Sequence, residues 1–272
     1  MFQPLWLEAA QRLQADNQPF ALVIVLRVVP PTSAQPGDKA VVTADGLIHG
    51  WVGGGCAQPA VIKTVRRALK DGRARTIRIA PQPETAEREL GDVLEFGMAC
   101  HSGGTLELFI DPVLARAPLT VHGDSPVARA LCDLAPRVGF AVSAPELDPS
   151  THPATAAHAK GWVVVATQGR GDLPALEAAL TSTPRGVWFV ASARKASVLK
   201  DSLLARGQDP TRVAAIVAPA GTPIGAKTPE EIALSVLGAV VAARRAASAP
   251  AAAPAGTAPP EHAPALPTPT GA

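Results

Sequence analysis

The stretch PLTVHGDSPVARALCDLAPRVGFAVSAP, residues 118–145, decides the fold of the second half of the chain. An apolar run comes first, and Ser125 and Pro126 then have the residue types preferred at the N-cap and first position of a helix. Gly139 follows the helical pattern, and a second apolar run begins after it. The stretch therefore predicts a strand, a helix over residues 125–138 and another strand.

Further apolar runs continue this alternation toward the C-terminal end. A last helix is predicted over residues 228–245, where Thr228 and Glu231 have the spacing of a capping box. Alternating strands and helices are typical of a parallel sheet with helices on both faces. We therefore predict an α/β protein whose second domain, residues 118–245, is Rossmann-like. The other expected strands of this domain are GWVVVAT (161–167), GVWFVAS (186–192) and VAAIVAP (213–219).

The first part of the chain, residues 1–113, has a different order of elements. Apolar residues recur at helical spacing in residues 5–17, and a second helix is expected over residues 59–70 with Pro59 at its first position. The expected strands are FALVIVLRVV, two strands around the turn in KAVVTADGLIHGWV, RTIRIAP and GTLELFIDP. These patterns predict a mixed α+β domain ahead of the Rossmann-like one.

The C-terminal segment, residues 246–272, is mostly Ala, Pro, Thr and Gly. Only Glu261 and His262 in it can carry charge. Such a segment buries too little apolar surface to offset the entropy lost on ordering. We predict a disordered tail.

Composition excludes several classes of protein. The chain is 47% hydrophobic and 18% charged, which allows a sizeable core. Its net charge of +2 gives no indication of nucleic-acid binding, and an odd cysteine count, 3, fits a reducing compartment. No secretory leader is visible, and the longest apolar run, about ten residues, is too short to span a bilayer. We expect a cytoplasmic protein without stable membrane insertion.

Two glycine-rich segments of the first domain each carry a cysteine. The N–H groups of Gly53, Gly54 and Gly55 can form a concave site for an anion. Cys56 lies just ahead of a predicted helix, whose positive end lowers the pKa of a thiol. The second segment adds the candidate binding residues Cys100, His101, Ser102 and Gly103.

These side chains suit a cofactor, a sulfur atom or a soft metal. Cys56 and Cys100 are candidate reactive thiols, and with His101 they are candidate metal ligands. The alternative is that the cysteines are small core residues and the glycines form tight turns. The sequence leaves both interpretations open.

The first turn of the second domain stands where a dinucleotide fingerprint is expected. Of its glycines only Gly123 is present, and Asp124 places a negative charge where a phosphate would lie. Gly123, Asp124 and Ser125 are candidate cofactor-binding residues. Glu146 and Asp148 follow the second strand near the position of a ribose-binding carboxylate. Binding of FAD or NAD(P) therefore stays open.

A second glycine-rich loop, residues 218–231, precedes the last predicted helix. Gly221 and Gly225 permit unusual backbone angles, and Lys227 stands just before the helix begins. This combination can hold a phosphate. The alternative is a plain connection with an exposed lysine.

Together, four segments resemble the XdhC/CoxI family of accessory proteins for molybdenum hydroxylases such as xanthine dehydrogenase and aerobic carbon monoxide dehydrogenase. The resemblance covers about residues 5–245. The forms GWVGGGCA and CHSGGTLE look closer to the CoxF and CoxI type, associated with carbon monoxide dehydrogenase. The segments are RVVPPTSAQPGDKAVVTADGLIHGWVGGGCAQPAV, GMACHSGGTLELFIDP, VHGDSPVARAL and APAGTPIGAKTPEEIALSVL.

The resemblance implies a maturation factor, and a cofactor chaperone more than a turnover enzyme. Family members are thought to bind the molybdenum cofactor (a molybdopterin dinucleotide) transiently, to protect it while its terminal sulfur is installed, and to help insert it. The implied partners are apo molybdenum hydroxylase subunits and other maturation factors, and a homodimer is left open. The alternatives are a protein that binds FAD or NAD(P) for the same enzyme, a copper-handling chaperone, and a scaffold that binds no small molecule.

The resemblance also carries over to individual residues. Gln58 departs from the acidic residue that the family often has there, and GDSPVA departs from the fuller GAGHVA turn of the xanthine dehydrogenase type. The matching positions are Gly54, Gly55, Cys56, Gly97, Cys100, His101, Gly103, Gly104, Gly123, Gly225, Ala226, Thr228, Pro229 and Glu230.

Overall fold

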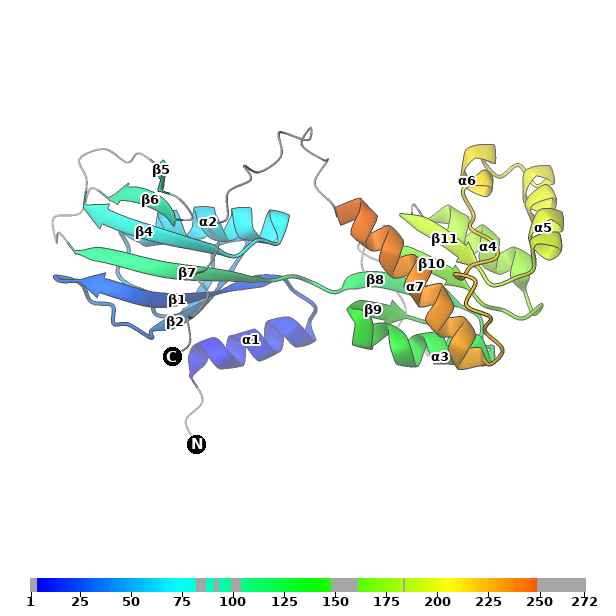
Figure 1. Ribbon diagram of the computed structural model, residues 1–272, viewed down its shortest axis with the longest axis horizontal. Coiled ribbons are helices and arrows are strands. Elements are labelled where there is room, and N and C mark those ends of the chain that lie inside the picture. Colours follow the sequence, from blue (N-terminus) through cyan, green and yellow to red (C-terminus); the bar gives the residue numbers. More distant parts are fainter. Residues whose placement is uncertain are drawn as a thin grey trace, which may run out of the picture. The chain divides into compact units, whose positions relative to one another are not determined.

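The chain divides into two compact units, Met1–Ala117 and Pro118–Ala272 (Figure 1). The computed structural model describes residues 4–81, 87–90, 93–98, 104–147, 161–182 and 184–248. Within this part of the chain, no helix is long and apolar enough to cross a membrane.

The first unit has the mixed α+β composition expected from the sequence. Its elements are α1 (Leu5–Ala15), β1 (Phe20–Val29), β2 (Lys39–Thr43), β3 (Ile48–Gly50), α2 (Gln58–Asp71), β4 (Arg75–Pro81), β5 (Glu87–Leu90), β6 (Val93–Met98) and β7 (Thr105–Val113). Among the described residues the seven strands form one sheet in the order β3-β2-β1-β7-β4-β6-β5. Neighbours are antiparallel except β4 and β6, which are parallel.

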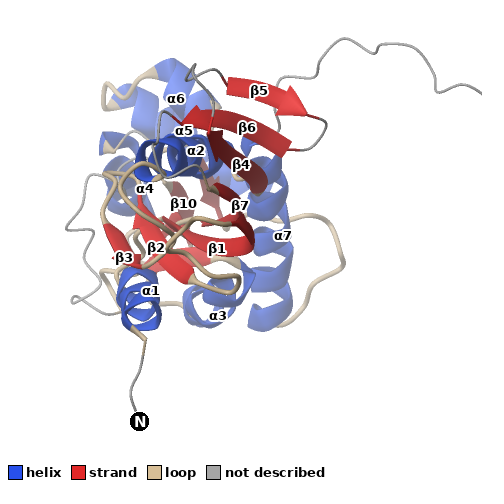
Figure 2. Cartoon of the chain, turned by 90° about the vertical axis from the view of Figure 1, so that its left-hand side faces the viewer, coloured by secondary structure: helices blue, strands red, loops and turns tan. Residues whose placement is uncertain are grey.

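Helix α2 and the sheet form the main core of this unit. Val61, Val65 and Ala68 recur at helical spacing and are fully buried against strand residues such as Val23 and Ile77. Figure 2 shows the strands curving around α2. Among the described residues, α2 is the helix that covers this side of the sheet.

Helix α1 covers part of the opposite face of the same sheet. Ala9 of the helix is buried with Phe20 and Val41 of the strands. Because side chains alternate along a strand, Phe20 faces α1 while its neighbour Ala21 belongs to the core under α2. This two-sided burial accounts for the continuous apolar run of β1.

Strands β5 and β6 are absent from the sequence expectations, although they form an antiparallel pair at the edge of the sheet. Three of the four β5 residues, Glu87, Arg88 and Glu89, are charged, so the apolar alternation of a strand is missing. Edge strands tolerate such charges because one side of their backbone has no neighbour.

The second unit is built around a smaller sheet. Its elements are β8 (Ala117–His122), α3 (Pro126–Leu134), the 3₁₀ turn η1 (Ala135–Val138), β9 (Phe140–Ser143), β10 (Trp162–Val165), α4 (Asp172–Thr181), β11 (Gly186–Phe189), α5 (Ala193–Ala205), α6 (Pro210–Ala214) and α7 (Pro229–Ser248). Within the described residues the strand order is β11-β10-β8-β9. β8, β10 and β11 are mutually parallel, which confirms the Rossmann-like prediction.

Both faces of this sheet are covered by helices. Val163 and Val165 of β10 belong to a core shared with α4 and α5. Val164 points to the other face and is equally buried. A strand that is buried on both faces has apolar residues at successive positions, so the run WVVV in the sequence predicts such a strand.

The expected strand VAAIVAP, residues 213–219, is wrong. Val213 lies in the short helix α6, which begins after the N-cap Asp209 with Pro210 at its first position. Only Val217 forms a strand-like bridge, parallel to Trp188 of β11. Of this apolar run only Val213 and Ile216 are buried, three residues apart as on a helix, and in so short a run periodicity does not separate helix from strand.

The ends of two helices differ from their predicted forms. After α3 the predicted helix tightens into the turn η1, because Pro136 has no backbone N–H to donate. Gly139 then takes the left-handed conformation expected past a helix end. Helix α7 continues to Ser248 rather than residue 245, through an alanine-rich stretch that favours helix. The rest of the expected tail lies outside the described residues.

Candidate cofactor site at the carboxyl edge of the parallel sheet

The strand order of the second unit defines where a ligand site is expected. Numbered within the unit, and with the Val217 bridge as a fifth position, the order is 2-1-3-4-5. The switch point lies between β8 and β10, and ligands of such folds bind there, beyond the carboxyl ends of the strands. A hollow of about 450 Å³ occupies this place, and its lining includes Gly123, Asp124, Glu146, Thr167, Arg170 and Gly171. We call it the crevice.

Gly123 forms the floor of the crevice. Its φ is +110°, and a Cβ built on it would lie 2.5 Å from the Ala166 carbonyl oxygen. The Ala166 N–H also donates to the His122 carbonyl at 2.8 Å. Glycine is therefore required because the turn after β8 touches the turn after β10, whether or not a phosphate approaches it.

Ser125 is engaged by the fold on two sides. Its hydroxyl oxygen accepts the Ala128 N–H at 3.1 Å as the N-cap of α3, as predicted. The same hydroxyl donates to the Ala166 carbonyl. Ser125 thus helps to hold the crevice floor, and its role as a direct cofactor ligand stays a prediction.

Asp124 and Arg170 face each other across the crevice rim. The carboxylate and guanidinium groups are 3.9 Å apart, with 48% and 77% of the side chains exposed. Exposed pairs of this kind contribute little to stability. Arg170 is consequently available to an anionic ligand, which would compete with Asp124 for it.

Glu146 stands after the second strand of the unit, where a ribose-binding carboxylate was expected. Its Oε1 lies 2.9 Å from Nδ1 of His122, so one carboxylate oxygen is held by the fold. Glu146 also lines the crevice. Asp148, the other acidic candidate, lies outside the described residues.

The loop after β10, residues 167–171, was missed by the sequence analysis. Gln168, Gly169 and Gly171 all have positive φ, at 52°, 93° and 80°. The loop leads from a buried strand into α4, with Gly171 as its N-cap. The sequence signal was present as TQGRGD directly after WVVVA, a glycine-rich strand-to-helix turn.

Asp172 anchors this loop to the rest of the unit. Its carboxylate accepts the Gly169 N–H at 3.2 Å and the Thr167 hydroxyl, and it lies 2.5 Å from Nζ of Lys195. Burial opposes ionisation, but the bonds from Lys195 and Thr167 outweigh it and hold the pKa of Asp172 below its ordinary value. The pair therefore joins the loop after β10 to the start of α5.

The glycine-rich loop before α7 is arranged differently from the predicted phosphate site. The N–H groups of Lys227 and Thr228 donate to the Glu231 carboxylate at 2.7 and 3.1 Å. The Glu231 N–H donates to the Thr228 hydroxyl at 3.3 Å, which confirms the capping box. These backbone bonds lower the pKa of Glu231. The chain's own carboxylate thus occupies the amides that a phosphate would need.

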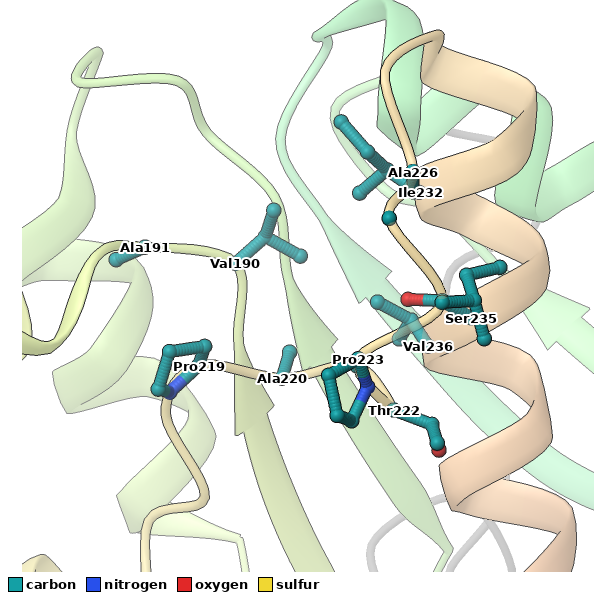
Figure 3. Close-up of a pocket in the computed structure, with 13 residues that line it drawn as sticks. Val190, Ala191, Pro219, Ala220, Thr222, Pro223, Ala226, Ile232, Ser235 and Val236 are labelled. Carbon is teal, nitrogen blue, oxygen red and sulfur yellow. The ribbon is translucent and has the colours of Figure 1, made fainter.

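A hollow of about 540 Å³ lies beside this loop, and we call it the closing-loop pocket (Figure 3). Gly221 and Gly225 line it, whereas Lys227 does not. Gly225 has a φ of +72° with no neighbour near a built Cβ, so its need for glycine is conformational. Two of the three residues expected around a ligand in this loop are therefore close to a cavity.

The first glycine-cysteine turn belongs to the other unit. Gly53 has a φ of +118° and lies against Leu106, so it serves packing. Gly54 and Gly55 are exposed, as is Cys56, which lies just before the first residue of α2, Gln58. The exposed thiol near a helix start agrees with the expected geometry, while its lowered pKa stays a prediction.

Of the two other cysteines, Cys132 lies within the described residues and Cys100 does not. Cys100, His101, Ser102 and Gly103 lie outside the described residues, so the proposed metal ligand set stays a prediction. Within the described residues no group of three or more His, Cys, Asp or Glu side chains could hold a metal. Burial, aided by Asp133, raises the pKa of Cys132 to about 11, so this thiol stays protonated at neutral pH.

Fold and site together define a Rossmann-type domain with a ligand crevice, preceded by an α+β unit. Residues 119–240 match the model of the XdhC Rossmann domain, and residues 13–80 match the model of the XdhC and CoxI family. The chain belongs to the XdhC and CoxI family.

Two individual proteins are also similar to this chain. The uncharacterized protein YqeB of Escherichia coli (strain K12) is 29% identical over 262 residues, which are 87% of this chain and 46% of that protein. The chain thus spans about half the length of this relative. A crystal structure described as a xanthine dehydrogenase from Bacillus halodurans aligns with 16% identity and a TM-score of 0.41, over 88% of this chain and 95% of that one.

Proposed function

We propose that this chain is an accessory factor in the maturation of a molybdenum hydroxylase, and that its second unit holds a molybdopterin dinucleotide before the cofactor reaches the enzyme. Membership of the XdhC and CoxI family supports the maturation role. The crevice at the switch point carries the cofactor assignment, because folds of this type bind nucleotides there.

The residues around the crevice fit the nucleotide half of such a cofactor. Arg170 is only loosely neutralised by Asp124 and can pair with a diphosphate. Glu146 is placed to accept a hydroxyl hydrogen of a ribose. Asp124 opposes the phosphate, so an incoming diphosphate has to displace this carboxylate from Arg170.

Within this role, we assign carbon monoxide dehydrogenase as the target enzyme. Two observations support this assignment. The segments GWVGGGCA and CHSGGTLE look closer to the CoxF and CoxI type, and Cys56 is exposed beside the start of α2. If Cys56 contacts the cofactor or its sulfur, Cys56→Ala should lower activation of the apo-enzyme while the fold is kept. Unchanged activation would remove the thiol from the mechanism.

The test of the cofactor assignment is to purify the full chain from a host that makes molybdopterin cofactors. Pterin and nucleotide released on denaturation are then measured by fluorescence and mass spectrometry. We expect close to one molybdopterin dinucleotide per chain, and at least a fivefold lower content in Arg170→Ala. Arg137→Ala is the matched control, because Arg137 is an exposed arginine in the turn η1 and does not line the crevice. A wild-type protein without pterin would overturn the proposal.

A second candidate is a protein that binds FAD or NAD(P) for the same enzyme. The observation that favours it is Glu146, which follows the second strand as ribose-binding carboxylates do in Rossmann folds. In the same experiment, release of flavin or nicotinamide nucleotide without pterin would support this candidate against the first.

A further inference from the structure

The closing-loop pocket has an unusual lining. Its walls include Val190, Pro219, Pro223 and Ile232, and none of the described residues that line it is ionisable. Its volume of about 540 Å³ is within the range of small-molecule sites, roughly 300 to 1,000 Å³. A charged group entering it would lose its hydration without gaining an ionic partner, so a neutral and largely apolar ligand is favoured.

One polar side chain in this pocket is left without a partner by the fold. Ser235 of α7 is only 8% exposed, and within the described residues its hydroxyl makes no hydrogen bond. Figure 3 shows that the hydroxyl points away from α7, toward the side where Val190 and Ala220 lie. Because this oxygen is not fully enclosed, it can bond water or a polar atom of a ligand that enters the pocket.

The backbone opposite is shaped to admit this hydroxyl. A Cβ built on Gly221 would lie 1.9 Å from Ser235 Oγ. The loop is also tied to α7, because the Thr222 N–H donates to the Ser235 carbonyl at 3.3 Å. Glycine at position 221 therefore leaves room for the Ser235 hydroxyl beside the apolar walls of the pocket.

We infer that the closing-loop pocket binds a neutral heteroaromatic ring, which packs between aliphatic and proline side chains and bonds Ser235 through a polar atom on its edge. This inference rests on the proposed function, in which the ring belongs to the cofactor. The pocket lies beside β11 and the Val217 bridge, two strand positions from the crevice at the same edge of the sheet. One extended dinucleotide can therefore place its phosphates at the crevice and a ring here.

Both halves of the cofactor carry such a ring, a pterin at one end and a nucleobase at the other. Calorimetric titration of the full chain with biopterin and with cytidine distinguishes them, because neither probe carries a phosphate. Binding of biopterin alone assigns the pterin to this pocket, and binding of cytidine alone assigns the base. If neither probe binds, the inference is overturned.

Variants then locate the bound ring. Ser235→Ala should weaken binding about tenfold, the effect of one hydrogen bond. Ile224→Asp should abolish it, because a carboxylate enters the apolar wall at a side chain already 54% exposed, where the fold tolerates charge. Ser202→Ala is the control, because this α5 serine bonds the Val198 carbonyl outside the pocket. Equal affinity in all four proteins would overturn the inference.

The cofactor content of Ile224→Asp separates this inference from the proposed function. If the variant copurifies with the dinucleotide as the wild type does, the pocket is wrong and the maturation role stands. If the wild type carries no pterin but binds a free ring through Ser235, the pocket stands and the maturation proposal fails.

Discussion

At the scale of single residues, close backbone approaches account for several glycines that resemble ligand motifs. Gly123 touches Ala166, and Gly104 lies where a Cβ would be 2.0 Å from the Pro31 carbonyl oxygen. The sequence correctly marked these positions as special. It could not separate a glycine that admits a ligand from one that admits the neighbouring chain, because both need the same missing side chain.

Gly221 offers a direct test of such an approach. Gly221→Ala should lower the free energy of unfolding by about 1–3 kcal/mol, because the new methyl group collides with Ser235 Oγ. In a Ser235→Ala background the nearest remaining atom is Ser235 Cβ at 3.2 Å, so most of the loss should disappear. Denaturant unfolding of the four proteins in this double-mutant cycle measures the coupling.

Gly225 supplies the contrast within the same loop. Gly225→Ala strains a positive φ but meets no neighbour, so Ser235→Ala should not relieve its cost. If Gly221→Ala lowers the free energy of unfolding equally with serine and with alanine at position 235, the collision with Ser235 Oγ is not the reason that position 221 needs glycine.

At the scale of elements, the sequence predicted those that carry local signals. β1 was recognised from its apolar run, and α2 and α3 from Pro59, Ser125 and Pro126 at their starts. The failures were β5, whose charges hide its alternation, its partner β6, and residues 213–219, which enter the sheet only through the bridge at Val217. The loop of residues 167–171 was missed because its importance comes from the strand order, which brings it beside Gly123.

The pair of Asp172 and Lys195 connects two elements and should show a defined pH dependence. The folded pKa of Asp172 is lowered, so the stability it provides is present above its ordinary value of 3.8 and is lost as the pH falls through the folded pKa. Lys195→Met should cost about 1–2 kcal/mol at pH 7, less than a fully buried pair because Lys195 is 38% exposed. The difference from wild type should shrink near pH 3.

Lys200 on the same helix is the matched control. Its Nζ donates to the Ile216 carbonyl at 2.7 Å, and a carbonyl does not titrate. Denaturant unfolding at pH 7 and pH 3 should therefore give the same loss for Lys200→Met at both values. A loss for Lys195→Met that is also constant with pH would contradict the role given to Asp172.

At the scale of the whole molecule, each unit has a hydrophobic core of its own. The core around α2 draws on residues up to Ile110, and the core of α4 and α5 begins at Val163. The division falls between Ala117 and Pro118, close to the boundary expected from the change in element order. Candidate residues therefore separate into two sets, with Cys56 in one unit and the crevice in the other.

A fragment of residues 115–272 should consequently fold alone. We expect helical circular dichroism and a cooperative denaturant transition, because β8 and the helices on both faces of its sheet are included. A fragment beginning at residue 126 lacks β8, the strand between β9 and β10, and should show no cooperative transition. Failure of the longer fragment would mean that its core depends on the first unit.

The contact between Gly123 and Ala166 has a consequence for the kinetics of binding. The turns after β8 and β10 are joined by this contact, by the Ala166–His122 hydrogen bond and by Ser125, so their backbone entropy is already lost when the domain folds. A ligand arriving at the crevice finds its floor preorganised. Association should then follow a single phase whose rate rises linearly with ligand concentration, without the plateau that a slow rearrangement would impose.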